Sequence, residues 1–311
     1  MAQEPDKTLL QKPLLRYWLA TRPAFLAASL IPVLIGMAAV AYRGGNVSLV
    51  LLLLTLLATA LVHAGVNVLN DYYDDENGTD ARNTQRIFPF TGGSRFIQNG
   101  VLSKGETVLF GALLLSAAIL LGIGLAWISG TGLLWIGVAG VLVGWGYSAP
   151  PLRLNSRGLG EPAVALGFGI LTPLGAWFVQ TGEMDSYPVL ISLPVALLVM
   201  NILFINQFPD HQADAASGKH HWVVRMGLVK APRVYLIAAA LATIVVLLLI
   251  VDGQLPLWAL LSLLPLMLSF KAGMLLQQHA SHPQLLEPAI KMTIASMILH
   301  GVLLSLTLWL V

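Results

Sequence analysis

Long apolar runs, each about the length of a helix that crosses a bilayer, dominate this sequence. A spanning helix needs about 20 consecutive apolar residues, and about nine stretches meet that requirement by the hydropathy rule. Charged residues make up only 10% of the chain and mean hydropathy is +0.78, whereas soluble domains carry about 25% charged residues. We therefore predict an all-α, polytopic membrane bundle with spans near 23–42, 48–70, 106–128, 131–148, 159–180, 188–208, 232–251, 255–277 and 289–310.

The basic residues predict how this bundle is oriented. All 17 Lys and Arg residues except Arg43 fall on the side of the N-terminus when the apolar runs are threaded through a bilayer. Positive residues stay cytoplasmic, so we predict a cytoplasmic N-terminus and an extracytoplasmic C-terminus in the cell membrane. Residues 1–311 are interpreted as one membrane domain. Within it, residues 1–21 are predicted to be an interfacial segment, because leucines and aromatic residues mix there with basic ones.

Composition also excludes several classes of function. The chain has no cysteine, so disulfides, thiol catalysis and thiolate metal sites are excluded. The net charge of +2 gives no indication of nucleic-acid binding, and no nucleic-acid partner is expected. The histidines form no HExxH pattern, so no zinc site is predicted. His63 is interpreted as a bundle histidine, and His220 and His221 as loop residues.

Two acidic clusters follow the second and sixth apolar runs. The first contains Asn67, Asn70, Asp71 and Asp74, and the second contains Asp210 and Asp214. Both clusters lie at the same predicted end of the bundle, and residues three or four apart share a helix face, so the carboxylates can converge. Carboxylates packed near lipid are costly unless positive charge offsets them. Mg²⁺ binds such oxygen ligands together with substrate phosphate oxygens, so the clusters predict a Mg²⁺ cofactor.

Basic residues follow each acidic cluster, as binding of a diphosphate requires. Arg86 and Arg95 come after the first cluster and Lys219 after the second. Arg and Lys bind phosphate oxygens that metal ions leave free, and the Gly-Gly-Ser run before Arg95 offers backbone N–H groups to an anion. Asp75 and Glu76 point off the shared helix face and are interpreted as solvated acids.

On these motifs the chain resembles the UbiA-type intramembrane prenyltransferases. Asn70-Asp71-Tyr72-Tyr73-Asp74 matches the NDxxD motif after helix 2 of that family, and Asp210-His211-Gln212-Ala213-Asp214 matches the DxxxD motif after helix 6. The stretches NVLNDYYDDENGTD and YSAPPLRLNSRGLGE are most similar to prenyltransferases of 1,4-dihydroxy-2-naphthoate in menaquinone biosynthesis. The resemblance implies that a polyprenyl group moves from a polyprenyl diphosphate to an aromatic quinone precursor within membrane lipid.

The resemblance also implies roles for individual residues. It implies Mg²⁺ ligands at Asp71, Asp74, Asp80, Asp210 and Asp214, and substrate contacts at Asn67, Asn70, Arg22, Arg86, Arg95, Lys219 and Arg153. Tyr147 is expected beside the reacting centre. Segment 81–104 is predicted to cover the site, because water must be kept away from the cation-like allylic fragment.

Other functions stay open at this point. Pro209 stands where the naphthoate enzymes often carry a basic residue, so another acceptor, such as 4-hydroxybenzoate, or a cyclase activity is an alternative. A cation-coupled transporter is a second alternative, although transporters place charged sites near the bilayer midplane and these acids lie at one rim. A CDP-alcohol phosphotransferase is a third, but its continuous acidic signature is absent from the sequence.

Overall fold

The computed structural model describes residues 3–310, and all regular secondary structure in that range is helical. The predicted domain 1–311 and segment 1–21 include residues 1, 2 and 311, which lie outside the described residues. The α-helices are α1 (Pro13–Ala20), α2 (Pro23–Tyr42), α3 (Leu49–Glu76), α4 (Thr79–Arg82), α5 (Lys104–Ser129), α6 (Gly132–Ser148), α7 (Gly160–Leu166), α8 (Thr172–Thr181), α9 (Tyr187–Ala216), α10 (Trp222–Val251), α11 (Leu266–His279) and α12 (Glu287–Trp309). The 3₁₀ segments are η1 (Lys7–Gln11), η2 (Leu154–Ser156), η4 (Leu257–Leu263) and η5 (Pro283–Leu285), whereas η3 (Gly167–Leu171) is a π-helical turn.

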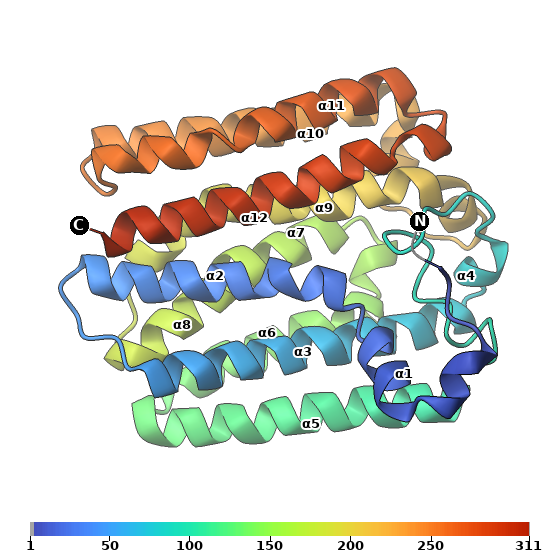
Figure 1. Cartoon of the computed structure of the whole chain (residues 1–311), viewed down its shortest axis with the longest axis horizontal. Helices are drawn as coiled ribbons and strands as arrows, with labels where there is room; N and C mark the ends of the chain where they lie inside the picture. Colours follow the sequence, from blue (N-terminus) through green and yellow to red (C-terminus); the bar gives the residue numbers. More distant parts are fainter. Residues whose placement is uncertain (1–2, 311) are drawn as a thin grey trace.

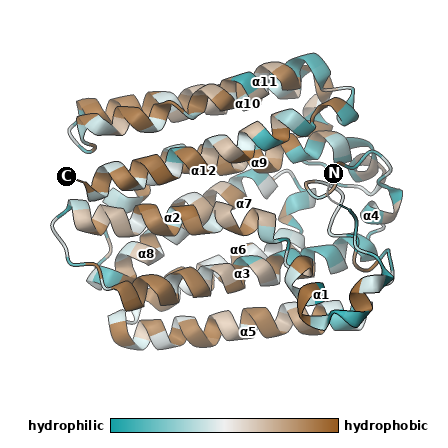
Figure 2. Ribbon diagram, in the orientation of Figure 1, coloured by the Kyte–Doolittle hydropathy of each residue, from teal (hydrophilic) through white to brown (hydrophobic). Residues whose placement is uncertain are grey.

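Within residues 3–310, eight helical stretches are long and apolar enough to cross a membrane, which makes this a multi-pass membrane protein. They coincide with the predicted spans except at 131–148, where the apolar helix α6 has 17 residues. Hydrophobic residues cover the long helices, and hydrophilic residues gather at the end of the bundle that holds α4 and the N-terminus (Figure 2). The bundle therefore has one strongly polar end, as the loop composition predicts.

Helices α3 and α9 both extend past their apolar runs and carry the acidic motifs on their last turns. Helix α3 continues to Glu76, and α9 continues through Pro209 to Ala216. Helix α10 begins at Trp222, so only residues 217–221 separate α9 from α10. Hydropathy locates the residues that contact lipid, not the residues where a helix ends, so it places such boundaries too early.

Two predicted spans, 159–180 and 255–277, are interrupted, and the second is divided into η4 and α11. The span predicted at 159–180 is divided into α7, the π-helical turn η3 and α8. The Gly167 carbonyl accepts both the backbone N–H of Thr172, which is the bond of a π-helical turn, and Thr172 Oγ1 at 2.8 Å. In α10 the backbone leaves helical geometry at Gly227, whose φ is +75°, so the region before this glycine is a separate short helix.

Helix α9 is the central element of the bundle. Of its most apolar window, 72% is buried inside the protein, compared with 17% for α3 and for α5. Ile191, Val195 and Leu198 recur at helical spacing and are fully or almost fully buried, and they belong to one core with residues of α2 and α12. In Figure 1, α3 and α5 lie on one side of α9, and α10 and α11 on the other. The second acidic motif is thereby fixed to the most buried helix.

The N-terminal segment packs along the polar end of the bundle (Figure 1). Arg16 of α1 forms an ion pair with Glu106 at 3.3 Å, so the segment is attached to the first turn of α5. Leu14 and Trp18 remain 89% and 55% exposed, which leaves an apolar face of α1 open at this end of the molecule.

Candidate functional site

A cavity of about 780 Å³ extends from the polar end of the bundle into its apolar middle. It lies between α2, α3, α5, α6, α9 and the interrupted helix α7–η3–α8. Acidic, amide and basic side chains line its outer end, whereas valine, leucine, isoleucine and glycine line the remainder. One space therefore offers a charged compartment and a long apolar compartment.

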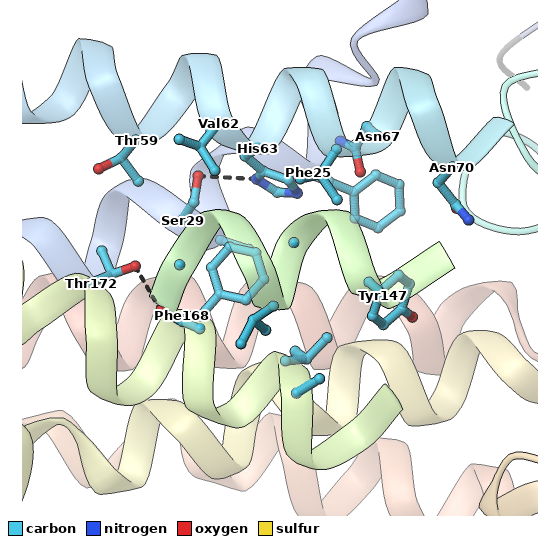
Figure 3. Close-up of a pocket in the computed structure, with 18 of the residues that line it drawn as sticks. Phe25, Ser29, Thr59, Val62, His63, Asn67, Asn70, Tyr147, Phe168 and Thr172 are labelled. Carbon is cyan, nitrogen blue, oxygen red and sulfur yellow. Dashed lines mark hydrogen bonds between the residues drawn. The ribbon is translucent and has the colours of Figure 1, made fainter. Parts of the chain in front are cut away.

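The first acidic motif contributes one face of α3 to this cavity. Asn67, Asn70 and Asp74 line it, and Asn67 and Asn70 face the same space as Tyr147 (Figure 3). Asn70 Nδ2 donates to Asp74 Oδ2 at 3.2 Å and to Ser148 Oγ at 2.8 Å. These contacts hold the Asp74 carboxylate in place at the charged end.

Asp71 does not share that face, contrary to the prediction from spacing. Its Oδ1 accepts a hydrogen bond from the Ser94 backbone N–H at 3.0 Å, and it lines a small separate pocket rather than the cavity. Adjacent residues lie about 100° apart around a helix, so Asp71 points away from Asn70 toward the segment that follows α4. In this arrangement Asp71 holds the glycine-containing segment against α3.

The second acidic motif lies opposite the first, and Lys219 joins the two. Lys219 Nζ is 2.7 Å from Asp74 Oδ1 and 3.3 Å from Asp214 Oδ1. Burial alone lowers the pKa of Lys219, but the carboxylates of Asp74 and Asp214 outweigh it and raise that pKa. His221 Nε2 lies 3.0 Å from Asp214 Oδ2, and Asn83 Nδ2 donates to Asp210 Oδ1. The structure thus brings the two predicted clusters together.

Asp80 is buried beside the Gly-Gly-Ser run. Its side chain is 2% exposed, and burial together with the carboxylates of Asp74 and Asp71 raises the pKa of Asp80 well above its usual value. Gly93 has φ of +73°, and a Cβ there would lie 2.3 Å from Asp80 Oδ2. Only glycine permits this approach, so the predicted anion-binding run is instead the close support of an acidic residue.

The predicted basic residues divide into two groups. Arg22 lines the cavity, where its guanidinium lies 4.9 Å from the centre of the Phe25 ring and donates to the Phe90 carbonyl at 3.2 Å. Arg86, Arg95 and Arg153 do not line it. Arg86 pairs with Glu4 at 2.7 Å, Arg95 donates to the Asp80 backbone carbonyl, and Arg153 is exposed.

Segment 81–104 contributes to the outer wall of the cavity. Phe90, Thr91, Gly92 and Gly93 line the charged end, and the Gly92 N–H donates to Asp210 Oδ2 at 3.2 Å. Because the segment also binds Asp71 through Ser94, it connects both acidic motifs. This position agrees with the predicted cover.

Several site residues escape prediction from the sequence. Asn83, Asn206, Gln207 and His221 all line the charged end of the cavity, but none of them forms a recognisable spacing pattern by itself. His221 was interpreted as a loop residue, and it does lie between helices, yet it is only 2% exposed and contacts Asp214. Its position two residues after Lys219 is the one sequence feature that could have indicated a place in the site. Asp75 and Glu76 instead pair with Lys104 at 2.9 and 2.6 Å.

The donor atoms at the charged end suit a hard cation such as Mg²⁺. In the described range 3–310, no three acidic or histidine side chains already form a closed metal site. Mg²⁺ takes only one or two carboxylates and leaves its other positions to phosphate oxygens and water, so an open set fits it. The buried side-chain oxygens of Asn83, Asn206 and Gln207 have no hydrogen-bond partner in this part of the chain. Unused oxygen donors and several buried carboxylates together fit the cation.

Such a site, charged at one end and apolar along the rest, suits an amphipathic ligand with a charged head and an apolar tail. The family model described as the UbiA prenyltransferase family matches residues 29–297. The chain therefore belongs to the UbiA prenyltransferase family.

Relatives and solved structures agree with this assignment. The chain is 30% identical to 1,4-dihydroxy-2-naphthoate octaprenyltransferase from Bacillus subtilis, over 78% of this chain and 75% of that protein. It is also 30% identical to the enzyme of that name from Haemophilus influenzae, over 74% of this chain and 75% of the other. A UbiA homologue from Archaeoglobus fulgidus, solved with DMAPP and Mg²⁺, has the same fold, with a TM-score of 0.65 at 18% identity over 92% of this chain and 98% of that one.

Proposed function

We propose that this prenyltransferase moves a polyprenyl group from its diphosphate to 1,4-dihydroxy-2-naphthoate, a precursor of menaquinone. The observation that carries the proposal is the single cavity that joins a charged end to an apolar compartment. A polyprenyl diphosphate has the same division into a charged head and an apolar tail. The names of the two bacterial relatives support the naphthoate acceptor.

The charged end is assigned to the diphosphate. Lys219 and Arg22 line it and supply positive charge for phosphate oxygens that a metal leaves free. Asp74, Asp80, Asp210 and Asp214 would hold Mg²⁺, which when bound supplies the charge that stabilises a departing diphosphate. Asp71 and the segment's own Arg86 and Arg95 do not line the cavity and are assigned to holding segment 81–104 in position. Asp71 accepts from the Ser94 N–H, and Arg95 donates to the Asp80 carbonyl. Arg153 is assigned to the exposed rim, where it would meet incoming substrate.

The apolar compartment is assigned to the isoprenoid tail. Ile119 and Ile123 of α5 and Val138 of α6 line the cavity and are 43%, 51% and 51% exposed. We therefore assign to α5 and α6 the wall through which the cavity opens. A long tail enters and leaves most directly through this wall, from the lipid phase.

The transfer needs charge stabilisation and exclusion of water more than it needs a general base. The allylic carbon–oxygen bond breaks and its electron pair leaves with diphosphate, whose growing charge lies beside Lys219 and Arg22. The ring carbon that bears the carboxylate forms the new carbon–carbon bond. Carbon dioxide then leaves, and the electron pair of its bond restores the aromatic ring. Tyr147 lines the cavity below the charged end, where its ring face can stabilise the allylic cation.

The topology proposed with this function has nine spans, one domain, a cytoplasmic N-terminus and an extracytoplasmic C-terminus in the cell membrane. The ninth span is α6, whose 17 residues reach the lower limit of about 17 residues for a spanning helix. The distribution of basic residues supports this orientation, because only Arg43 falls on the far side.

The test is an assay of purified protein with Mg²⁺, a polyprenyl diphosphate and a panel of acceptors that includes 1,4-dihydroxy-2-naphthoate and 4-hydroxybenzoate. We expect a prenylated naphthoquinol product and release of diphosphate and CO₂. Transfer to 4-hydroxybenzoate alone would replace the naphthoate acceptor, which is the alternative raised by Pro209. Absence of product with every acceptor would overturn the proposed function.

A further inference from the structure

His63 is a polar side chain in the apolar compartment, and the transfer described above gives it no role. It lies on α3 one turn before Asn67, and both line the cavity, as does Thr59 one turn earlier (Figure 3). Along the helix, His63 is about 16 Å from Asp74, at a rise of 1.5 Å per residue. A polar ring at such a depth of a bilayer is costly unless it has a partner.

Hydrogen bonds define which nitrogen of the His63 ring carries the proton. Ser29 Oγ donates its only proton to the Leu26 carbonyl at 2.7 Å. The same Oγ lies 3.0 Å from His63 Nδ1, so in that contact Nδ1–H is the donor and Ser29 the acceptor. In a neutral imidazole the other nitrogen is then an acceptor. Nε2 therefore presents a lone pair, and no group within residues 3–310 donates to it.

The ring that faces His63 is held equally firmly. Phe168 lies with its ring centre 5.1 Å from that of His63, at an angle of 63°. It belongs to the π-helical turn η3, which Thr172 stabilises through the Gly167 carbonyl. The turn is pressed against α9, since a Cβ on Gly169 would lie 2.0 Å from the Ala196 Cβ. π-Helical turns occur frequently at functional sites, and here one places an aromatic ring in the cavity.

The two substrates differ in what they can offer His63. The diphosphate is matched by the charged end, and an isoprenoid tail has no hydrogen-bond donor. A hydroxylated aromatic acceptor has both a donor and a ring. For one of its ring carbons to attack the allylic carbon of the donor, it must lie directly below the diphosphate, at the depth of the turns that carry Asn67 and His63.

We propose that Nε2 of His63 accepts a hydrogen bond from a ring hydroxyl of the aromatic acceptor, while Phe168 packs against the acceptor ring. This inference rests on the proposed function and extends it to the residues that select the acceptor. A phenol that donates to an imidazole nitrogen has a more electron-rich ring, which favours attack by a ring carbon. His63 would therefore both orient the acceptor and increase its nucleophilicity.

A second buried histidine provides a matched control. His300 of α12 also has its Nδ1 bonded, to the Ser262 carbonyl at 2.7 Å, and its Nε2 has no partner in the described part of the chain. It is fully buried and does not line the cavity. Substitution of His300 therefore reports the general cost of changing an intramembrane histidine in this bundle.

The experiment measures equilibrium binding of 1,4-dihydroxy-2-naphthoate and its two monomethyl ethers by calorimetry, with Mg²⁺ and without prenyl donor. We expect the wild type to bind the dihydroxy compound about tenfold more tightly than one of the ethers, the effect of one hydrogen bond. His63→Leu should lose this preference, His63→Gln should retain part of it, and His300→Gln should retain all of it. Binding of inorganic diphosphate with Mg²⁺ should stay unchanged in all three variants, because the charged end is intact.

The outcomes separate the two proposals. Full retention of the hydroxyl preference in His63→Leu would overturn the role of His63 and leave the proposed function standing. If the wild type binds none of the naphthoates, the naphthoate acceptor is wrong. The same variants tested with 4-hydroxybenzoate and its methyl ether then decide the role of His63 for that acceptor.

Discussion

Replacing Lys219 with methionine should destabilise the protein strongly unless Mg²⁺ is present. The side chain of Lys219 is only 9% exposed, and its Nζ contacts Asp74 at 2.7 Å and Asp214 at 3.3 Å. At an effective dielectric constant of about 20, a pair of charges 2.7 Å apart attracts with about 6 kcal/mol. Desolvation of the ammonium offsets part of this. Removing one partner of a buried ion pair costs about 3–5 kcal/mol, because the other partner is left without compensation.

The measurement is the midpoint of thermal unfolding in detergent, with and without Mg²⁺. We expect Lys219→Met to lower the midpoint by about 5–10 °C in the absence of the ion. Mg²⁺ should recover much of that loss in the variant and raise the wild type less, because the ion neutralises the same carboxylates. Prenyl transfer should nevertheless stay low, since the contact with diphosphate is missing.

Lys104→Met is the matched control for this prediction. Lys104 also contacts two carboxylates, those of Asp75 and Glu76, at 2.9 and 2.6 Å. Its side chain is 52% exposed, and ion pairs in water contribute little to stability. The control should therefore unfold close to the wild type. Equal midpoints for the Lys219 and Lys104 variants, with no difference in their response to Mg²⁺, would refute the assignment of Lys219 as the buried cation that joins the two motifs.

Three further predictions follow from the site. Gly93→Ala should reduce kcat/KM by about 100-fold. The added Cβ displaces the Asp80 carboxylate, and small displacements of catalytic groups have effects of that size. Steady-state kinetics that match the wild type would contradict this prediction. Asp74→Asn should lower turnover by about 100-fold or more, whereas Asp75→Asn should leave turnover nearly unchanged. Equal losses in the two variants would disprove the assignment of Asp74, but not Asp75, to the charged end of the cavity. A reporter fused to the C-terminus should lie outside the cytoplasm, and a cytoplasmic signal would exclude nine spans with a cytoplasmic N-terminus.

The parts of the fold that depend on apolar length were predictable from the sequence. Solvation by lipid imposes a run of about 20 apolar residues on each span, and that signal is strong enough to locate α2, α3, α5, α9, α10 and α12. The π-helical turn η3 and the break at Gly227 were not predictable. The turn depends on the approach of Gly169 to Ala196 of α9, which no periodicity in the chain records. A single glycine such as Gly227 is often tolerated inside a helix, so it does not by itself predict a break.

The same distinction explains which predicted site residues line the cavity. Asp74, Asp210 and Asp214 stand at helical spacing on α3 and α9, so the packing of two helices is enough to bring them into one cavity. Asp71 has the same spacing but faces Ser94. Helical periodicity shows which residues share one side of a helix, but it does not show how that side is turned relative to the cavity. The arginines were harder still. A guanidinium on a long side chain can reach several acceptors, and Arg86 is held by Glu4, which is 82 positions away in the sequence.

Lys219 contacts carboxylates of both acidic motifs, and these contacts can keep the site stable before a substrate arrives. Six aspartates lie in and around the two motifs, and several of their carboxylates are buried. Without a cation they would repel one another, yet the bundle has to fold and remain assembled between turnovers. Lys219 lies between Asp74 and Asp214, where it offsets part of this repulsion. Incoming Mg²⁺ and diphosphate can then exchange partners with the lysine, since the carboxylates go to the metal and the ammonium goes to phosphate oxygens. A single buried lysine can therefore stabilise the empty site and bind the leaving group in the occupied one.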